Sequence, residues 1–556
     1  MAKIYKIHPA IGIARVGNSS EHFVGPEIPG IAASPPDGRF KAAGQVKRQA
    51  ARFRVFEYDD SAPGVAPVEI TLGTASIEWT VHLANRKAAW YKFQGLTGED
   101  GNYPPNSLRN RQIQPTSPTD VESGARRALI IDPRPRRIAG ADQEVEVSEG
   151  GSGTPDETWP PPFVNGRRIQ SLGTLYTDEA GRLKVAGGYG TSGTPNANRM
   201  PPVLPDIQWN NNDEWWDDVS DGPVTATLVF QNGERREVES PAWVVVGVPD
   251  FAPTVDSIVT AFDVLYDLAV RRFALRPDLF SGGQFRGGQN GYRPSYTREI
   301  YPIIKRAADQ RWVFRIAGHN SLMNHNVLGK LLPNDPTLGA RRNIFQRLNN
   351  PDAPHPFGRP PLVQRWMPWL RGDEDEPTAL TLTRTQYFLM SQWRQGFFVG
   401  DWNGVPAPAQ TISPDGLDLA ALEGISGGAF YPGMEVGWII RNPAIYRQDT
   451  GPVGLRIIHR SPQDPDGLMA GDLTKRMALP WQADFNACNG NWWPAHRPQD
   501  VRIAGLPTHV PWDAPQPGQP TLLNFDMVDA WHQLGFVKGD PNGSAPLLEG
   551  ERNWPR

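Results

Sequence analysis

The chain of 556 residues contains a single cysteine, Cys488. One thiol cannot form an internal disulfide, so no disulfide bond stabilises the fold. No stretch of about 18 apolar residues is present, so we expect no transmembrane helix and no membrane partner. The N-terminus carries no convincing secretory signal, because Arg15 interrupts a short apolar run. These absences predict a cytoplasmic protein, with non-classical export as the remaining way out of the cell.

The chain also lacks an excess of positive charge. It has 56 basic and 60 acidic residues, a formal net charge of −4. No strongly basic face follows from this balance, so nucleic acid is not expected as a partner. Hydrophobic residues make up 39% and charged residues 21%, which is typical of a globular protein. Glycine and proline number 56 each, so the fold should be rich in loops.

The order of apolar patterns along the chain predicts an α+β fold. Residues 222–240 are typical of a hairpin that turns at Asn232-Gly233, and 242–251 of a buried strand. Helical spacing appears over 254–275, 295–314 and 383–398. Pro302 must then lie in a first turn or kink its helix.

We therefore expect three regions within a large mixed fold. They are a β-rich N-terminal region (1–252), a mainly helical region (253–410) and a loop-rich C-terminal region (411–556) that contains Cys488. No clear flexible linker separates them, which is compatible with one continuous body.

Three patterns resemble functional sites without meeting their requirements. The segment "GYGTSG" (188–193) matches a dinucleotide-binding loop, but "TPNANRMPPV" follows where a helix is required. It lies within one of two Gly- and Pro-rich stretches, 148–162 and 187–202, that predict surface loops or domain edges. His319 and His325 lie six residues apart, which favours a structural pair over a metal site.

The third pattern is an acidic segment, 209–223, with five carboxylates: Asp213, Glu214, Asp217, Asp218 and Asp221. Their spacing is not that of a calcium-binding loop. A solvated loop is the expected structure, and a structural cation is the less favoured alternative.

Cys488 permits three interpretations. It can be a small buried hydrophobe, which is the usual state of a free cysteine. It can be a nucleophile with His496 or His509 as its base. It can also be covalently modified, and the carboxylate of Asp484 four residues before it, together with the neighbouring tryptophans, favours this third interpretation.

Several long segments resemble one family. "GDLTKRMALPWQADFNAC" (471–488) is similar to the cofactor-bearing segment of the LodA-like quinoprotein amino-acid oxidases, which are relatives of lysine ε-oxidase and glycine oxidase. The resemblance extends to "IHPAIGIARVGNS" (7–19), "WWDDVSDGPVTATL" (215–228), "GGAFYPGMEVGWIIRNPAIY" (427–446) and "MVDAWHQLGFV" (527–537). It therefore covers nearly the whole chain.

The resemblance implies a cysteine tryptophylquinone, a cofactor in which a cysteine sulfur is bonded to a tryptophan ring that has gained two oxygens. The cysteine can only be Cys488, and the tryptophan that matches the family motif is Trp531. Spacing alone does not decide between Trp531 and the nearer Trp481, Trp492 and Trp493. Asp484 matches the aspartate that the family needs to form the cofactor.

The resemblance also implies an activity and partners. The protein would oxidatively deaminate a free amino acid with dioxygen, releasing ammonia and hydrogen peroxide. Asp484 is the first candidate for proton transfer, and His509 and His532 are weaker candidates that are more simply explained as structural. A separate flavoprotein would complete the cofactor, and the family usually forms homo-oligomers. No metal is implied.

Two other functions stay open at this level. The chain could be a quinoprotein dehydrogenase that passes electrons to another acceptor, or an inactive family member that serves in binding or assembly. The presence of Asp484, Cys488 and Trp531 together argues against loss of activity. Neither the amino acid, nor the amine that is oxidised, nor the residue that binds its carboxylate can be named from the sequence.

Overall fold

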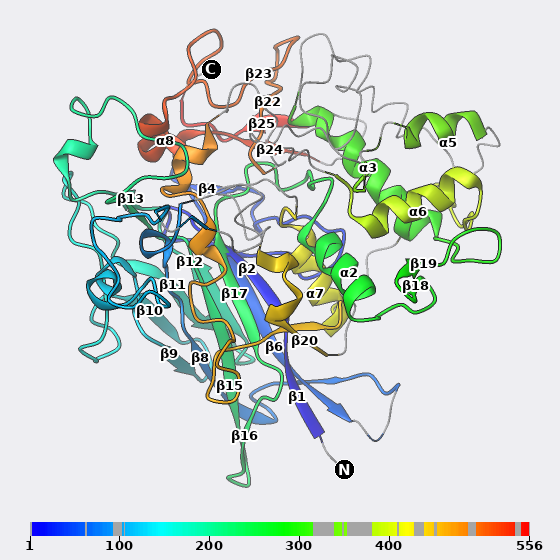
Figure 1. Ribbon diagram of the computed structural model, residues 1–556, viewed down its shortest axis with the longest axis horizontal. Coiled ribbons are helices and arrows are strands. Elements are labelled where there is room, and N and C mark those ends of the chain that lie inside the picture. The colour runs from blue at the N-terminus through cyan, green and yellow to red at the C-terminus, as the bar shows by residue number, and fades with distance from the viewer. Residues whose placement is uncertain are drawn as a thin grey trace.

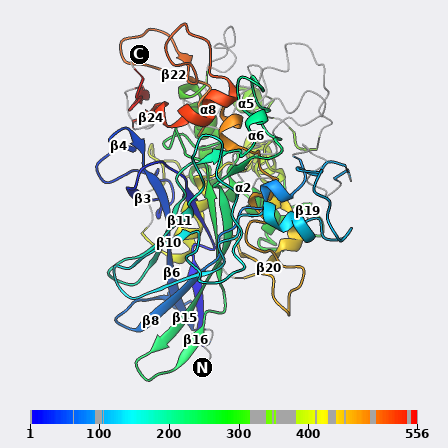
Figure 2. The same cartoon turned by 90° about the vertical axis from the view of Figure 1, so that its left-hand side faces the viewer.

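The computed structural model describes residues 3–59, 61, 64–92, 103–104, 106–314, 338–346, 348, 350–352, 381–407, 411–427, 439–449, 453–486, 496–539 and 546–554. Within these ranges every helix is too short or too polar to span a membrane. The sheet occupies one end of the molecule, and the last elements of the chain lie over the other end (Figures 1 and 2).

One sheet of 13 strands organises the first 250 residues. Its main path runs β10-β11-β12-β6-β2-β17-β15-β8-β9, and β1, β3 and β7 pair with β6 while β16 pairs with β15. Contacts between β9 and β10 bring the two ends of this path together, so the sheet curls toward a barrel. The strands are β1 (Lys3–His8), β2 (Ile11–Arg15), β3 (His22–Val24), β6 (Arg48–Asp59), β7 (Val68–Ile70), β8 (Ala75–Val81), β9 (Arg136–Ala139), β10 (Glu144–Ser148), β11 (Ser171–Thr177), β12 (Leu183–Gly187), β15 (Ser220–Phe230), β16 (Arg235–Glu237) and β17 (Ala242–Gly247).

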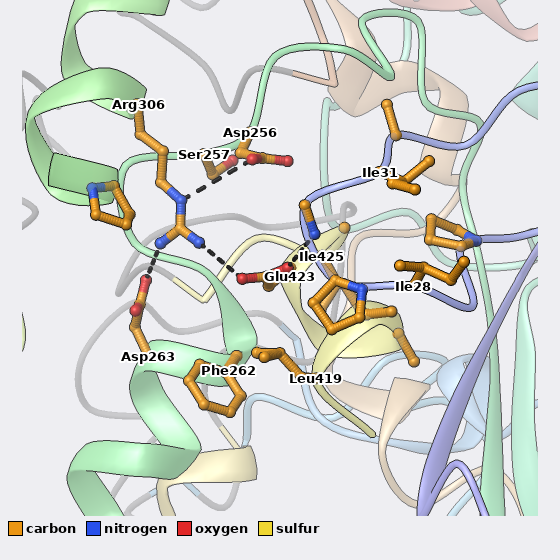
Figure 3. A pocket seen from close by; sticks show the side chains of 18 of the residues that line it. Ile28, Ile31, Asp256, Ser257, Phe262, Asp263, Arg306, Leu419, Glu423 and Ile425 are labelled. Atoms are coloured by element: carbon orange, nitrogen blue, oxygen red, sulfur yellow. Dashed lines mark hydrogen bonds and ion pairs between the residues drawn. The ribbon is translucent and has the colours of Figure 1, made fainter. Parts of the chain in front are cut away.

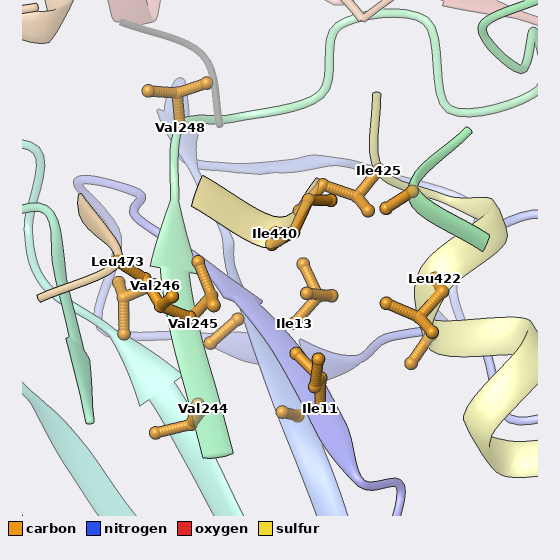
Figure 4. Close-up of a cluster of buried hydrophobic side chains, with 14 of the residues drawn as sticks. Ile11, Ile13, Val244, Val245, Val246, Val248, Leu422, Ile425, Ile440 and Leu473 are labelled. Carbon is orange, nitrogen blue, oxygen red and sulfur yellow. The ribbon is translucent and has the colours of Figure 1, made fainter. Parts of the chain in front are cut away.

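The centre of the sheet is buried on both faces. Every residue of β17 is buried, which explains its continuous apolar run rather than an alternating one. β17 pairs in parallel with β2, and Ile11 and Ile13 of β2 extend toward Leu422 and Ile440 (Figure 4). Each aliphatic side chain buried in this way contributes about 1.5–3 kcal/mol. The predicted hairpin is confirmed as β15 and β16, which pair antiparallel.

The helices lie beside the sheet (Figure 1). Pro302 lies in the first turn of its helix, where its missing N–H is not needed. The helix expected from residue 254 begins seven residues later, because Thr260 and Asp263 form a capping box that starts it. The helices are α2 (Ala261–Arg272), α3 (Tyr301–Asp309), α5 (Leu338–Phe345), α6 (Arg384–Gln395), α7 (Pro414–Glu423) and α8 (Asn524–Ala530).

The C-terminal region is loop-rich, as predicted. It contains α7, α8, several 3-10 turns and three two-stranded sheets. These sheets pair β20 (Tyr446–Gln448) with β21 (Leu455–Ile457), β22 (Asp500–Val501) with β23 (Val510–Pro511), and β24 (Phe536–Lys538) with β25 (Leu548–Gly550). The mixed α+β class is confirmed, whereas the boundaries at 252 and 410 stay a prediction. Contacts cross both boundaries: His8 Nδ1 lies 3.0 Å from Asp418 Oδ1.

Candidate functional site

The segment that leads to Cys488 runs through the interior. Residues 471–485 run from the start of β15, where they contact Asp221, to a buried 3-10 helix, Trp481–Phe485, which carries Asp484. Cys488, like Trp492 and Trp493, lies outside the described residues, as do His319 and His325. The site is therefore built from the residues that lead to Cys488 and from those that surround Asp484 and Trp531.

Asp221 fixes the start of this segment. Its Oδ1 accepts the backbone N–H of Thr474 at 2.8 Å and the Thr474 hydroxyl at 2.6 Å. Its Oδ2 accepts the N–H of Leu473 at 3.2 Å and the indole N–H of Trp243 at 2.9 Å. Burial raises the pKa of Asp221 to about 6, and these donors oppose the rise by favouring the charged form.

Asp217 fixes the middle of the segment. Its Oδ2 accepts the N–H of Trp481 at 3.0 Å and the ammonium group of Lys87 at 2.8 Å. Lys87 also donates to the carbonyl of Ala478 at 2.9 Å, and both ends of this ion pair are fully buried. Arg109 supports the same stretch by donating to the carbonyl of Met477 at 2.8 Å.

The solvated loop predicted for residues 209–223 is therefore wrong. Asp217, Asp218 and Asp221 are buried, because β14 (Trp216–Asp217) and the start of β15 run through the interior. Among the described residues no group of three or more His, Cys, Asp or Glu could hold a metal ion. The carboxylates serve instead as acceptors that position residues 471–481.

Asp484 differs from these carboxylates. Its side chain is fully buried, and neither carboxylate oxygen has a hydrogen-bond partner within the described part of the chain. Burial raises its pKa well above the ordinary value, and the charges of Arg497 and Lys87 only partly oppose that rise. A bare buried carboxylate costs stability, so its presence needs a functional reason.

Trp531 packs on the 3-10 helix that carries Asp484. It follows α8, is 2% exposed, and its ring lies 5.2 Å from that of Trp481 at an interplanar angle of 66°. The ring of Trp481 also lies 5.2 Å from that of Phe485, so the 3-10 helix that carries Asp484 has an aromatic ring at each end. The structure thus brings together Trp531 and the helix of Asp484, which are far apart in sequence.

A second contact ties the Cys488 side of the segment to α8. The amide of Asn486 donates to Asn524 Oδ1 at 2.8 Å, and Asn524 is the first residue of α8. Asn524 donates in turn to the carbonyl of Ile207 at 2.9 Å. The chain two residues before Cys488 is thereby held beside the helix that presents Trp531.

The candidate histidines occupy different surroundings. His496 is 3% exposed, and burial lowers its pKa well below the ordinary value, so it is neutral at pH 7. His532 is half-buried, its ring lies 5.8 Å from that of Trp531, and burial followed by the charge of Lys41 lowers its pKa. His509 lies in the loop before β23.

The surface loop predicted for 187–202 is wrong over its first half. Gly187, Gly188, Gly190 and the residues from 192 to 194 are buried. The physical reason is Gln482, whose amide donates to the carbonyl of Gly190 at 2.9 Å and whose Oε1 accepts the Ser192 hydroxyl. The glycine motif is thus a packing element against the Asp484 segment, and no helix follows it that could bind a dinucleotide.

A cavity of about 1090 Å³ opens between the helices and the sheet. Figure 3 shows an ionic wall, where Arg306 donates to Asp263 at 2.9 Å and to Glu423 at 3.5 Å and lies 3.9 Å from Asp256. Ile28 and Ile31 form an apolar wall opposite. Loss of solvation on burial raises the pKa of Glu423 to about 7, although the positive charge of Arg306 opposes the shift.

The described lining of this cavity includes neither Asp484 nor Trp531, but it does include His496, the first described residue after Cys488. The carbonyl of His496 accepts the N–H of Phe251 at 2.8 Å. The ring of Phe251 lies 6.0 Å from that of Phe485, next to Asp484. The cavity therefore approaches the aromatic cluster through a short series of contacts.

The residues present fit a cofactor made from the chain's own side chains. A buried indole, a bare buried carboxylate and the backbone leading to Cys488 converge, and no external group needs to be held. Sequence reasoning missed the positioning roles of Asp217, Asp221 and Gln482. The signal was available, because the first two lie in one resembling segment and Gln482 in another.

Comparisons with known proteins agree with this arrangement. A family model described as L-lysine epsilon oxidase N-terminal matches residues 8–246, and one described as L-lysine epsilon oxidase C-terminal domain matches residues 370–504. The L-lysine 6-oxidase of Marinomonas mediterranea is 32% identical over 541 residues, which cover 87% of this chain and 70% of that protein.

Solved structures of the L-Lys epsilon-oxidase from the same organism are also similar. Its crystal structure and that of its Schiff base intermediate with L-Lys each align with a TM-score of 0.77 and 27% identity. Each alignment covers 99% of this chain and 95% of the other.

Proposed function

The chain belongs to the L-lysine ε-oxidase family, and on this premise we propose that Cys488 and Trp531 form a cysteine tryptophylquinone with which it oxidises a free amino acid. Family membership makes it a quinoprotein amino-acid oxidase with a protein-derived quinone. The observation that carries the residue assignment is the buried carboxylate of Asp484, which accepts no hydrogen bond from the described residues and lies on the 3-10 helix whose Trp481 packs on Trp531.

Two contacts support Trp531 over Trp481 as the partner of Cys488. Asn486 is tied to α8, so the chain enters the Cys488 stretch next to the helix that ends at Trp531. Trp481 lies seven residues before Cys488. Its backbone N–H donates to the carboxylate of Asp217 in β14, away from the contact between Asn486 and α8. Trp531 also matches the family motif.

A quinone of this kind supplies an electrophilic carbonyl and a two-electron sink for the oxidation of a primary amine. Asp484 supplies the base that removes the proton from the amine-bearing carbon, because burial raises its pKa and so makes the carboxylate a stronger base than an exposed one. Trp481 and Phe485 exclude water around it. The positive charges of Arg497 and Lys87 favour the ionised form of the Asp484 carboxylate without donating a hydrogen bond to it.

The cavity provides the route by which substrate approaches. Asp256 is half-exposed, and with Asp263 and Glu423 it surrounds the guanidinium group of Arg306. Such an ionic wall accepts an ammonium group, and the apolar wall opposite accepts a hydrocarbon chain. We propose a free amino acid with a side-chain amine, of which L-lysine is the first to test, and dioxygen as the acceptor.

The proposal includes two protein partners. A separate flavoprotein completes the cofactor, and the chain assembles as a homo-oligomer. Expressed without the flavoprotein, the chain should contain Trp531 unmodified or only partly oxygenated. Recovery of the complete quinone from the chain expressed alone would contradict this part of the proposal.

The test is peroxide and ammonia release from each free amino acid by protein co-expressed with its neighbouring flavoprotein. Trp531→Phe should abolish both products, while Trp481→Phe should retain the quinone. Oxidation that needs an added acceptor and yields no peroxide would instead identify a dehydrogenase. A wild-type chain with no visible absorption band and no product would favour the inactive binding or assembly role.

A further inference from the structure

The turn from Gly188 to Ser192 lies against the tryptophan assigned to the cofactor. It connects β12 to β13 (Ser192–Gly193), and at its centre Gly190 has a φ of +70°. A Cβ atom on Gly190 would lie 2.2 Å from Cζ2, 2.9 Å from Cη2 and 3.1 Å from Cε2 of Trp531. All three atoms belong to the six-membered ring of the indole, and Cζ2 and Cη2 are bonded neighbours. Only glycine permits both this backbone conformation and this approach.

The turn is held from three sides. Gln482 donates to the carbonyl of Gly190 at 2.9 Å and accepts the hydroxyl of Ser192. Gly17 donates its N–H to the carbonyl of Gly188 at 3.1 Å. Asp218 lies behind the turn, because a Cβ on Gly188 would be 2.6 Å from its Oδ2. The turn therefore cannot retreat from the indole.

Asp218 is itself unusual. It is 1% exposed, and its Oδ1 has no hydrogen-bond partner among the described residues. Burial raises the pKa of Asp218 to about 7, although the N–H groups of Thr191 and Gly190 favour its charged form. A carboxylate that faces two backbone N–H groups draws the turn toward itself, and so fixes where Gly190 meets the ring.

Gln482 links this turn to the catalytic segment. It lies between Trp481, whose ring meets Trp531, and Asp484, two residues further on. A displacement of the turn would therefore move both the indole and the helix that carries the carboxylate.

We propose that the Gly188–Ser192 turn, held by Gln482 and Asp218, is a seat that fixes the indole of Trp531 for cross-linking and oxygenation. The inference rests on the proposed function and assigns positioning roles to Gly190, Gln482 and Asp218. The modification joins the Cys488 sulfur to the ring, adds two oxygen atoms and removes four hydrogens. Two molecules of dioxygen balance this oxidation with release of two molecules of water.

The test is Gly190→Ala in protein co-expressed with the flavoprotein. The matched control is Gly233→Ala, because Gly233 has a φ of +84° and nothing within 4 Å of an added Cβ. Both variants bear the same kind of backbone strain, but only Gly190→Ala also places a methyl group against Trp531, so its unfolding midpoint should fall further than that of Gly233→Ala. In Gly190→Ala the joined Cys488–Trp531 peptide and the visible band should fall at least tenfold, while Gly233→Ala should match the wild type.

An equal yield of joined peptide in Gly190→Ala and wild type would overturn the inference. If Gly190→Ala does not fold, Asp218→Asn decides the matter: a lower yield of joined peptide at an unchanged or raised unfolding midpoint supports the seat, and a full yield overturns it. Absence of the joined peptide from the wild type would instead refute the proposed function.

Discussion

Two buried carboxylates, one in contact with the segment 471–485 and one on it, differ in how their oxygens are satisfied. Asp221 meets the start of the segment and accepts four hydrogen bonds, from Thr474, Leu473 and Trp243. Asp484 lies at its end, is equally buried, and accepts none within the described chain. Burial raises the pKa of both carboxylates, that of Asp221 to about 6 and that of Asp484 well above its ordinary value. A satisfied carboxylate stabilises the fold, whereas a bare one is available for proton transfer.

The largest effect expected from this comparison is that of Asp484→Asn. The amide keeps the shape but cannot accept a proton, so amino-acid oxidation should fall by at least about 100-fold. Peroxide release measures this, and the visible band reports whether cofactor formation fails as well. A variant with more than about a tenth of wild-type activity would remove the proton-transfer role from Asp484.

Asp221→Ala should have the opposite signature. It leaves the donors of Thr474, Leu473 and Trp243 buried and unpaired, so the free energy of unfolding should fall by about 3 kcal/mol. Denaturant unfolding measures this, and Asp466→Ala, at an exposed position, is the control expected to change it by less than about 0.5 kcal/mol. Equal stability of the two variants would mean that Asp221 is not a scaffold residue.

A smaller effect concerns pH and stability. Because the pKa of Asp484 is raised in the fold, the folded state keeps a proton that the unfolded state loses above about pH 4. This group therefore costs stability increasingly as pH rises through that window toward its folded pKa. Asp484→Asn lacks the cost, so its unfolding midpoint should exceed that of unmodified wild type more at pH 8 than at pH 4. A constant difference would show that Asp484 does not titrate in this way.

The smallest effect is expected at a third carboxylate, which is partly exposed whereas the other two are buried. Asp256 has a side chain that is 47% exposed to the cavity, and it lies near Arg306 without a close hydrogen bond. Asp256→Asn should raise the KM for a substrate with a side-chain amine several-fold and leave kcat and the visible band unchanged. Steady-state kinetics with L-lysine measures this KM, and a free amino acid with an uncharged side chain is the control substrate. An unchanged KM would place the route of entry elsewhere.

The sequence predicts the elements better than their surroundings. The hairpin at Asn232-Gly233, the central strand of β17 and the helix of α6 follow from local patterns and are confirmed. The predicted start of α2 was wrong, because the capping box at Thr260 begins the helix after the apolar residues that precede it.

The candidate site shows the same limit. Motif resemblance predicts Asp484 and Trp531 as site residues, but it does not predict that Asp217 and Asp221 are buried acceptors, because acidic clusters are more often solvated. Nor does it predict that Gly190 packs on the indole of Trp531, more than 300 residues away in the sequence. Both features depend on contacts between residues far apart in the sequence, and such contacts leave no periodic pattern in the local sequence.

The most direct test of the account is peptide mass mapping of the chain purified with its maturation partner. The account predicts one species in which the Cys488 and Trp531 peptides are joined, with two oxygens gained and four hydrogens lost. A freely alkylated Cys488 together with an unmodified Trp531, in protein that nevertheless oxidises amino acids, would contradict it.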